Sequence, residues 1–182
     1  LVPAGNDFQE KRKTAREKLI NVARTLLGVE IGEDPLFVVN SGRYEYRNKG
    51  ADVFLDVLKK LNEESNGSRD ILAFVLIPAN TYGPRKDLAS RLKKNEANGP
   101  LSTPFLTHGL NDLGYDPIIN KIQDIHLSNE AAERVKLIFV PSYLDGRDGI
   151  INISYYDLLP AMDLAVFPSY YEPWGYTPME SL

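Results

Sequence analysis

The sequence predicts an α/β domain built on a doubly wound, mostly parallel, Rossmann-like sheet. Short segments that are apolar throughout alternate with longer amphipathic segments, as expected for parallel strands covered by helices on both faces. Gly, Pro and Asn bound the apolar segments, which are too short for helices. The length of 182 residues suits one domain. We therefore expect one α/β domain over residues 1–182.

The first half of the chain gives two helix–strand pairs. Residues 8–27 carry apolar side chains at helical spacing and end at Gly28, which suits a helix C-cap. LFVVN (36–40) predicts a buried strand, ADVFLDVLKKL (51–61) an amphipathic helix, and ILAFVLIPA (71–79) a second buried strand. Residues 80–115 are rich in Gly, Pro and Asn, and predict a long excursion that holds one short polar helix at 85–97.

The second half repeats the alternation. DPIINKIQDIHL (116–127) predicts a helix, KLIFVPSY (136–143) a third strand, YYDLLPAM (155–162) a short helix and LAVFPS (164–169) a fourth strand. Ligands of such sheets bind beyond the carboxyl ends of the strands, here the loops after 40, 79, 143 and 169. Because the chain starts at Leu1 and stops about one turn into a last helix, we expect a piece excised from a longer protein.

Composition excludes several classes of function. Lys and Arg number 21 against 25 Asp and Glu, so we expect no nucleic-acid partner. No apolar run approaches the ~20 residues that span a bilayer, so we expect no membrane partner. The absence of cysteine excludes thiolate metal sites and suits a cytoplasmic protein. His108 and His126 lie far apart with no metal-binding spacing, and we expect no metal.

The loop SGRYEYRNKG (41–50) leads from a strand into a helix, as a phosphate-binding loop would. It has neither GxGxxG nor GxxxxGK[ST], which argues against a dinucleotide or P-loop site. It offers Arg43 and, beside Gly50 at the helix start, Lys49. A cation there opposes the helix dipole unless an anion lies nearby. A solvated Lys49, with Arg43 paired to Glu45, explains the loop equally well.

FPSYYEPWGYTPMESL (167–182) places aromatic and fixed-backbone residues between a strand and a helix. Thr177-Pro178-Met179-Glu180 matches a capping box, in which Thr177 accepts from the N–H of Glu180 and the Glu180 carboxylate accepts from the N–H of Thr177. That role accounts for Glu180 but not for Glu172. Gly175 allows close approach of the backbone to an anion. An aromatic loop that simply covers the core remains an equal alternative.

SGRYEYRNKGADVFLDVLKKLN and VFPSYYEPWGYTPMES together resemble the donor-nucleotide half of glycogen synthases of the animal and fungal type. These are retaining glycosyltransferases with two Rossmann-like domains, the GT-B fold. Residues 1–62 and 105–182 carry the resemblance and 80–104 do so only loosely. The spacing from Glu172 to Glu180 matches the E-x7-E motif of retaining GT-B enzymes.

The resemblance implies roles for the residues of both loops. Arg43 and Lys49 match the residues that bind the donor pyrophosphate, and Glu172 matches the one that contacts the transferred glucose. Three neighbours are implied to surround the phosphates: Gly175, Tyr176 and Thr177.

The remaining donor contacts follow by the same matching. Glu180 is implied to bind the ribose, which a carboxylate at a first helical turn can do while capping. Tyr155 matches the tyrosine that stacks on the base, with its neighbour Tyr156 as an alternative. His108 and His126 match no functional position, and we expect structural roles for both.

The implied reaction transfers glucose from UDP-glucose or ADP-glucose to the non-reducing end of an α-1,4-glucan, with retention and without a metal or cofactor. The acceptor would bind through an N-terminal domain outside this chain, so we expect the isolated chain to be inactive. Two alternatives remain at this point: another retaining GT-B transferase, sucrose-synthase-like or lipid-glycosylating, and a non-catalytic nucleotide-sugar-binding module. The sequence does not distinguish the base of the donor, because every base has a face on which an aromatic ring can stack.

Overall fold

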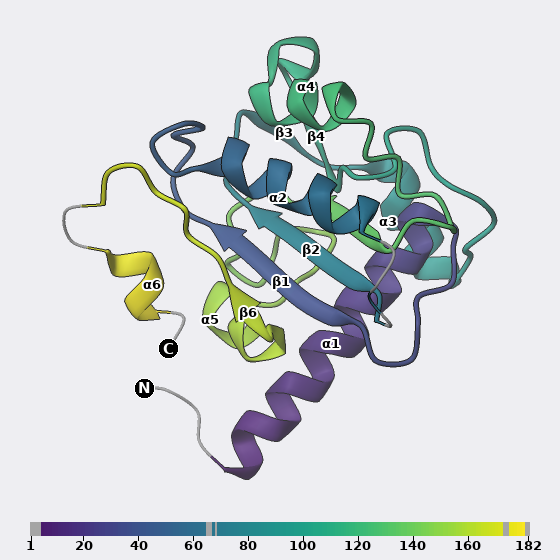
Figure 1. Cartoon of the computed structure of the whole chain (residues 1–182). Helices are drawn as coiled ribbons and strands as arrows, with labels where there is room; N and C mark the ends of the chain where they lie inside the picture. The colour runs from purple at the N-terminus through teal and green to yellow at the C-terminus, as the bar shows by residue number, and fades with distance from the viewer. Residues whose placement is uncertain (1–4, 65–66, 68, 173–174, 181–182) are drawn as a thin grey trace.

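A four-stranded parallel sheet organises the chain (Figure 1). The computed structural model describes residues 5–64, 67, 69–172 and 175–180. The strand order is β5–β2–β1–β6, and all three neighbouring pairs are parallel. The strands span the following residues: β1 Leu36–Ser41, β2 Ile71–Leu76, β5 Val135–Phe139 and β6 Leu164–Ala165. The predicted Rossmann-like α/β class is confirmed.

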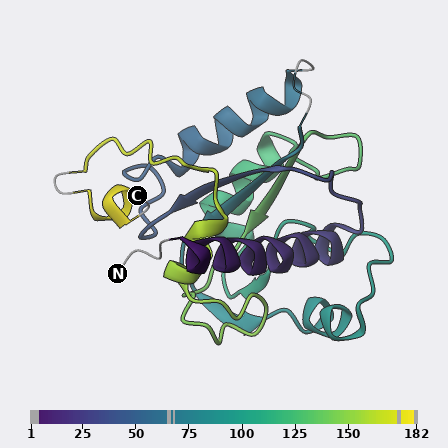
Figure 2. The same ribbon diagram turned by 90° about the horizontal axis from the view of Figure 1, so that it is seen from below.

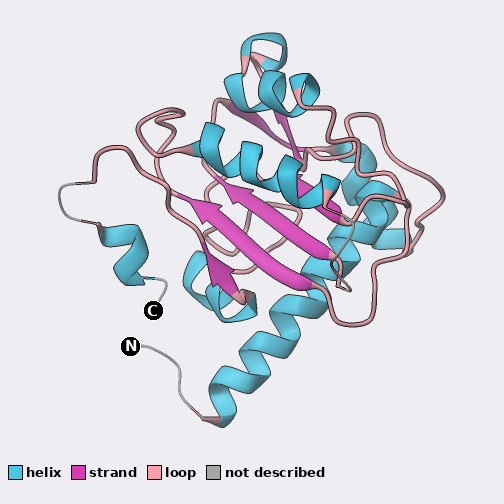
Figure 3. Ribbon diagram, in the orientation of Figure 1, coloured by secondary structure: helices cyan, strands magenta, loops and turns pink. Residues whose placement is uncertain are grey.

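Helices cover both faces of this sheet, as Figure 2 and the secondary-structure colouring of Figure 3 show. The long helix α1 lies on one face with the short α5 and its 3₁₀ turn η2, and α2 lies on the other face with α4. The helical bounds are as follows: α1 Asn6–Leu27, α2 Ala51–Glu63, α3 Lys86–Lys94, η1 Leu113–Tyr115, α4 Pro117–Asp124, α5 Tyr155–Leu158, η2 Leu159–Ala161 and α6 Tyr176–Glu180.

The central strand β2 shows why the strands are apolar throughout. All six of its residues are buried. Leu72, Phe74 and Leu76 pack into the core beneath α1, whereas the alternate residues, Ala73 among them, pack into the core beneath α2 and α4. Because successive side chains point to opposite faces, a strand covered on both sides needs an apolar residue at every position.

The strands end earlier than the sequence predicts, and proline accounts for this. The predicted strands 71–79, 136–143 and 164–169 end in the structure at Leu76, Phe139 and Ala165. Pro78, Pro141 and Pro168 follow within three residues, and proline has no N–H to donate to a ladder.

The fourth strand, β6, is the shortest because a side chain replaces the backbone as the partner of its next carbonyl. The Val166 N–H still donates to the Val39 carbonyl at 2.8 Å, but the Val166 carbonyl accepts from the Asn40 side chain at 2.8 Å. Just before β6, Asp163 accepts hydrogen bonds from Arg12 and Arg16 of α1 and from the Phe37 N–H. These bonds fasten the start of β6 to α1 and β1.

The excursion 80–115 contains a second sheet that the sequence analysis missed. β3 (Thr81–Pro84) pairs antiparallel with β4 (His108–Leu110), and the predicted helix in this region is α3. The ring of Tyr82 lies directly against Gly109, where any side chain would collide with it. Among the described residues, no helix is both long enough and apolar enough to cross a membrane.

Candidate functional site

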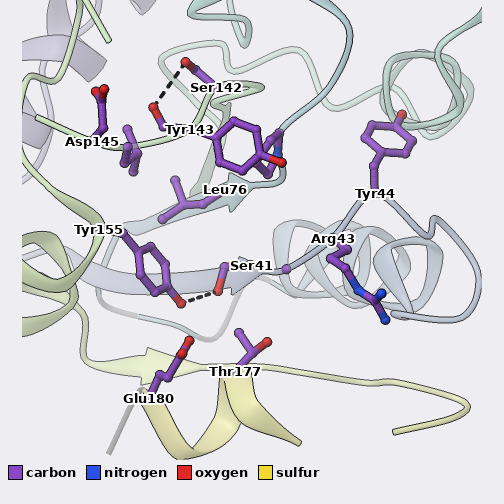
Figure 4. A pocket seen from close by; sticks show the side chains of 13 residues that line it. Ser41, Arg43, Tyr44, Leu76, Ser142, Tyr143, Asp145, Tyr155, Thr177 and Glu180 are labelled. Atoms are coloured by element: carbon purple, nitrogen blue, oxygen red, sulfur yellow. Dashed lines mark hydrogen bonds between the residues drawn. The ribbon is translucent and has the colours of Figure 1, made fainter. Parts of the chain in front are cut away.

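A cavity of about 650 Å³ opens at the carboxyl ends of β1, β2 and β5 (Figure 4). This is where ligands of parallel α/β sheets bind, and where the sequence analysis expects them. The lining comes from the loops after these strands, from α5 and from α6: Ser41, Gly42, Arg43, Tyr44, Leu76, Pro78, Ser142, Tyr143, Leu144, Asp145, Tyr155, Thr177 and Glu180.

Tyr155 is the best-anchored aromatic residue of the cavity. It begins α5, which Ser154 caps by accepting from the Asp157 N–H. The Tyr155 hydroxyl forms a 2.9 Å hydrogen bond with the Ser41 hydroxyl at the end of β1. Burial raises the pKa of Tyr155, so the phenol stays neutral at physiological pH. The adjacent Tyr156 is 61% exposed and does not line the cavity.

The two tyrosines of α5 contact each other and α6. Their rings meet edge to face, with centroids 5.4 Å apart and an interplanar angle of 72°. The Tyr156 hydroxyl donates to the Glu180 carboxylate at 3.0 Å, which places Glu180 below Tyr155 in the close-up (Figure 4). Thr177 lines the same wall.

The predicted capping box of α6 is wrong. The helix begins at Tyr176, and the Met179 N–H donates to the Gly175 carbonyl at 3.3 Å. Gly175 therefore stands at the N-cap position with φ of 69°, and Thr177 lies inside the first turn. Pro178 fits there because the first N–H groups of a helix have no intrahelical acceptor. Glu180 thus lies two residues beyond the position of a capping partner.

Arg43 lies at the rim of the cavity, on the other side from Tyr155 in Figure 4. Its side chain is 80% exposed and pairs with Glu45 at 3.0 Å. The next residue holds the loop in place, because the Tyr44 hydroxyl donates to Asp116 at 2.7 Å. Burial, and then this bond to Asp116, raise the pKa of Tyr44. The accessible Arg43 head group can reach an anion in the cavity.

Lys49 and Glu172 form an ion pair beside the cavity. The Glu172 carboxylate also accepts from the Ser169 hydroxyl at 3.3 Å and from the Gly175 N–H. The hydrogen bond from Lys49 is the main cause that holds the pKa of Glu172 below its usual range. Neither member of the pair is among the residues that line the cavity.

Backbone contacts hold the loops of this pair together. The Tyr170 N–H donates to the Asn48 carbonyl at 3.0 Å. Gly50, the residue before α2, has φ of 67°, and a Cβ there would overlap the Pro168 carbonyl and lie 2.9 Å from its ring. The loop after β1 and the loop after β6 therefore meet at a glycine that admits no side chain.

The structure gathers the predicted residues into two neighbouring groups. Four line the cavity: Arg43, Tyr155, Thr177 and Glu180. Three others meet beside it: Lys49, Glu172 and Gly175. Tyr176 is 63% exposed and is not among the residues that line the cavity. The Pro173 and Trp174 of the aromatic stretch lie outside the described residues.

Sequence reasoning missed several lining residues. Ser41 and Tyr44 belong to a loop that was singled out for its cations alone. Tyr143 was assigned to the predicted third strand, which ends at Phe139 in the structure. Asp145 lies in the loop after residue 143, to which the rule on strand ends pointed without naming a residue.

The lining suits a ligand with an aromatic ring, hydroxyl groups and a negative charge. Tyr155 and Tyr143 offer ring faces, Glu180 and Asp145 accept from hydroxyls, and the exposed guanidinium of Arg43 attracts an anion. Across the described part of the chain, no group of three or more His, Asp or Glu side chains is placed to hold a metal ion.

Comparison with known proteins supports the resemblance to glycogen synthases. The glycogen synthase family model matches residues 3–90 and 89–182. The two matches meet within α3, in the excursion where the resemblance is loosest. Glycogen [starch] synthase isoform 1 of Saccharomyces cerevisiae is 30% identical over 209 residues, which cover 81% of this chain and 29% of the yeast protein.

Two further relatives agree. The liver glycogen [starch] synthase of Mus musculus is 32% identical over 200 residues, covering 81% of this chain and 28% of the mouse protein. The Neurospora crassa glycogen [starch] synthase is 28% identical over 234 residues, covering 97% of this chain and 33% of the relative. The chain thus spans about a third of the length of the curated relatives that it matches. With a family model matched from residue 3 to residue 182, this chain belongs to the glycogen synthase family.

Proposed function

We propose that this chain binds the nucleotide-glucose donor of a glycogen synthase, which transfers glucose with retention to the non-reducing end of an α-1,4-glucan. The observation that supports this most directly is the cavity at the carboxyl ends of the strands. In a chain of this family, it combines an anchored aromatic ring, a carboxylate and an arginine.

Each part of the donor has a matching group. The base stacks on Tyr155, whose ring is fixed by the bond from its hydroxyl to Ser41. The ribose hydroxyls donate to Glu180, about one helical turn from Thr177 on the same helix. The diphosphate lies between Arg43 and the amide end of α6 at Gly175. This order places the glucose beyond the phosphates, next to Glu172.

The charges suit departure of a nucleoside diphosphate. As the bond to the glucosyl carbon breaks, negative charge grows on the leaving phosphate. Fixed cations and N–H dipoles directed at such charge usually supply the largest share of catalysis. We assign this stabilisation to Arg43 and Lys49, and assign to Glu172 hydrogen bonds with the sugar hydroxyls. Because these groups stabilise the leaving group directly, the proposed reaction uses no metal or cofactor.

Transfer also requires the acceptor glucan to be held against the donor. We propose that the glucan binds across a cleft formed with the remaining length of a full synthase. The 182-residue chain should then bind the donor and transfer no glucose.

Calorimetry of the chain with UDP, ADP, uridine and adenosine tests the proposal. Arg43→Ala should weaken binding of the diphosphate by ~1.5–3 kcal/mol, the range for a charge-assisted hydrogen bond, and leave nucleoside binding unchanged. Arg24→Ala is the control, because Arg24 of α1 also pairs with a glutamate, Glu30 beyond the helix end, and does not line the cavity. It should change neither affinity.

The possible outcomes separate the alternatives. If neither diphosphate binds, the donor site is wrong. If the donor binds but a longer protein containing this chain transfers no glucose to any acceptor, the chain is a nucleotide-sugar-binding module rather than part of an enzyme.

A further inference from the structure

The two groups that converge on Glu172 are groups that a donor phosphate would need. Lys49 and the Gly175 N–H, both assigned above to the diphosphate, bind the Glu172 carboxylate. The Lys49 and Glu172 side chains are only 13% and 25% exposed. Within the described residues, Glu172 is the only carboxylate within ion-pair distance of the Lys49 ammonium. The chain thus supplies its own anion at the start of α2.

We propose that the Glu172 carboxylate and a phosphate of the donor compete for the Lys49 ammonium and the Gly175 amide. This inference rests on the proposed function and gives that site an order of events. The arriving phosphate takes over Lys49 and Gly175, and the carboxylate is released toward the sugar. Only hydrogen bonds are exchanged, and no covalent bond forms or breaks.

Electrostatic repulsion favours replacement of the Glu172 carboxylate by the phosphate over binding of both anions to Lys49 at once. A carboxylate and a diphosphate repel each other, and in a half-buried site that repulsion is weakly screened. An ammonium that is 13% exposed also needs an anion, because a buried charge without a partner is strongly unfavourable. The phosphate supplies this anion, so the Lys49 ammonium keeps a partner when the carboxylate leaves.

The exchange also links phosphate binding to sugar binding. While Glu172 is bound to Lys49, Ser169 and Gly175, its carboxylate is occupied. It becomes available to glucose hydroxyls only once phosphate has replaced it. A glucose molecule without a diphosphate should therefore fail to engage Glu172.

The decisive variant is Glu172→Gln, which keeps the side-chain length and removes the charge. Calorimetry of the 182-residue chain with UDP and ADP should show binding about fivefold tighter or more, equivalent to roughly 1 kcal/mol. Affinity for uridine and adenosine should not change. Glu30→Gln is the control for net charge: its side chain is 82% exposed and pairs with Arg24, it does not line the cavity, and the change should tighten binding less than about twofold.

A variant of Lys49 tests whether the tighter diphosphate binding of Glu172→Gln depends on the Lys49 ammonium. In Lys49→Met, which keeps the apolar stem of the side chain, the further change Glu172→Gln should no longer tighten diphosphate binding. Melting temperatures establish that each variant is folded.

The results separate this inference from the function on which it rests. If UDP or ADP binds the unaltered chain but Glu172→Gln leaves the affinity unchanged or weakens it, Glu172 positions Lys49 for phosphate and the competition is wrong. Equal tightening in Glu30→Gln would assign the effect to net charge and would also overturn the competition. If neither diphosphate binds the unaltered chain or the Glu172→Gln variant, both the donor site and the competition fail.

Discussion

Replacing Gly50 by alanine should separate the two loops that carry Lys49 and Glu172. Gly50 has φ of 67°, a conformation that favours glycine, and its Cα faces the Pro168 carbonyl. An added methyl group would occupy the position of that carbonyl oxygen. Either the loop after β6 or the start of α2 must move, and the hydrogen bond from Tyr170 to Asn48 would be strained or lost.

Two effects add to give the expected loss of stability. The left-handed conformation costs alanine about 1–2 kcal/mol. Displacing packed backbone adds about 1–3 kcal/mol, the usual range for overpacking. A domain of this size loses roughly 2–4 °C of melting temperature per kcal/mol. The sum of about 2–5 kcal/mol therefore predicts a clearly visible shift.

Urea unfolding followed by circular dichroism measures the free energy directly, and Gly99→Ala isolates the conformational part. Gly99 has φ of 75°, but a Cβ there meets no atom within 4 Å. Gly50→Ala should lose at least ~1 kcal/mol more than Gly99→Ala, the lower end of the overpacking range. Equal losses would mean that the loops at Gly50 and Pro168 are not in firm contact.

Two further predictions concern a cavity residue and a buried histidine. Tyr155→Phe should retain nucleoside affinity while losing about 0.5–1.5 kcal/mol of stability with the bond to Ser41, whereas Tyr155→Ala should weaken uridine and adenosine binding by ~1–3 kcal/mol; equal affinity losses in calorimetry would argue against stacking. Burial lowers the pKa of His108, whose Nε2–H donates to the Asp148 carbonyl at 3.0 Å, so the folded chain favours the neutral ring. This stability should be fully present above pH ~6.5, the ordinary value, and fall by up to ~1.4 kcal/mol per unit as the pH drops below it. Urea unfolding on both sides of that pH checks this, and His108→Gln should flatten the profile; an unchanged slope in the variant would assign the acid sensitivity elsewhere.

Local patterns made most of the sheet predictable. β2 lies within its predicted apolar segment, β1 ends one residue beyond its segment, and β5 begins one residue before its segment. A strand covered on both faces leaves a continuous apolar run that the sequence shows. β3 and β4 contain no continuous apolar run. TYGP and HGL are short, contain glycine, and pair across the whole length of α3 and its flanking loops. Their stability comes from each other rather than from either segment alone.

Part of the candidate site could likewise be predicted from the sequence, and part could not. Matching to the family singled out Tyr155, Thr177 and Glu180, and all three line the cavity. Their roles toward a donor stay predictions. The contact between Lys49 and Glu172 joins residues 123 positions apart, and no local pattern reports a relation between two loops. The incorrect capping box has a similar cause, since Gly175 and the bond from Tyr156 to Glu180 decide where α6 begins and what its carboxylate binds.

The position of β6 in the sheet has a consequence for how the protein is made. β1 is the first of the four strands to be translated, and its neighbour β2 follows within a short stretch of chain, but β6 pairs with β1 across more than a hundred intervening residues. Pairings of such long range form slowly, and synthesis proceeds from the N-terminus. The strands β1, β2 and β5 can therefore assemble while one edge of β1 still waits for its partner. Thr177 and Glu180, which build one wall of the cavity, follow β6 in the chain, so the cavity can be completed only after the whole sheet has been translated.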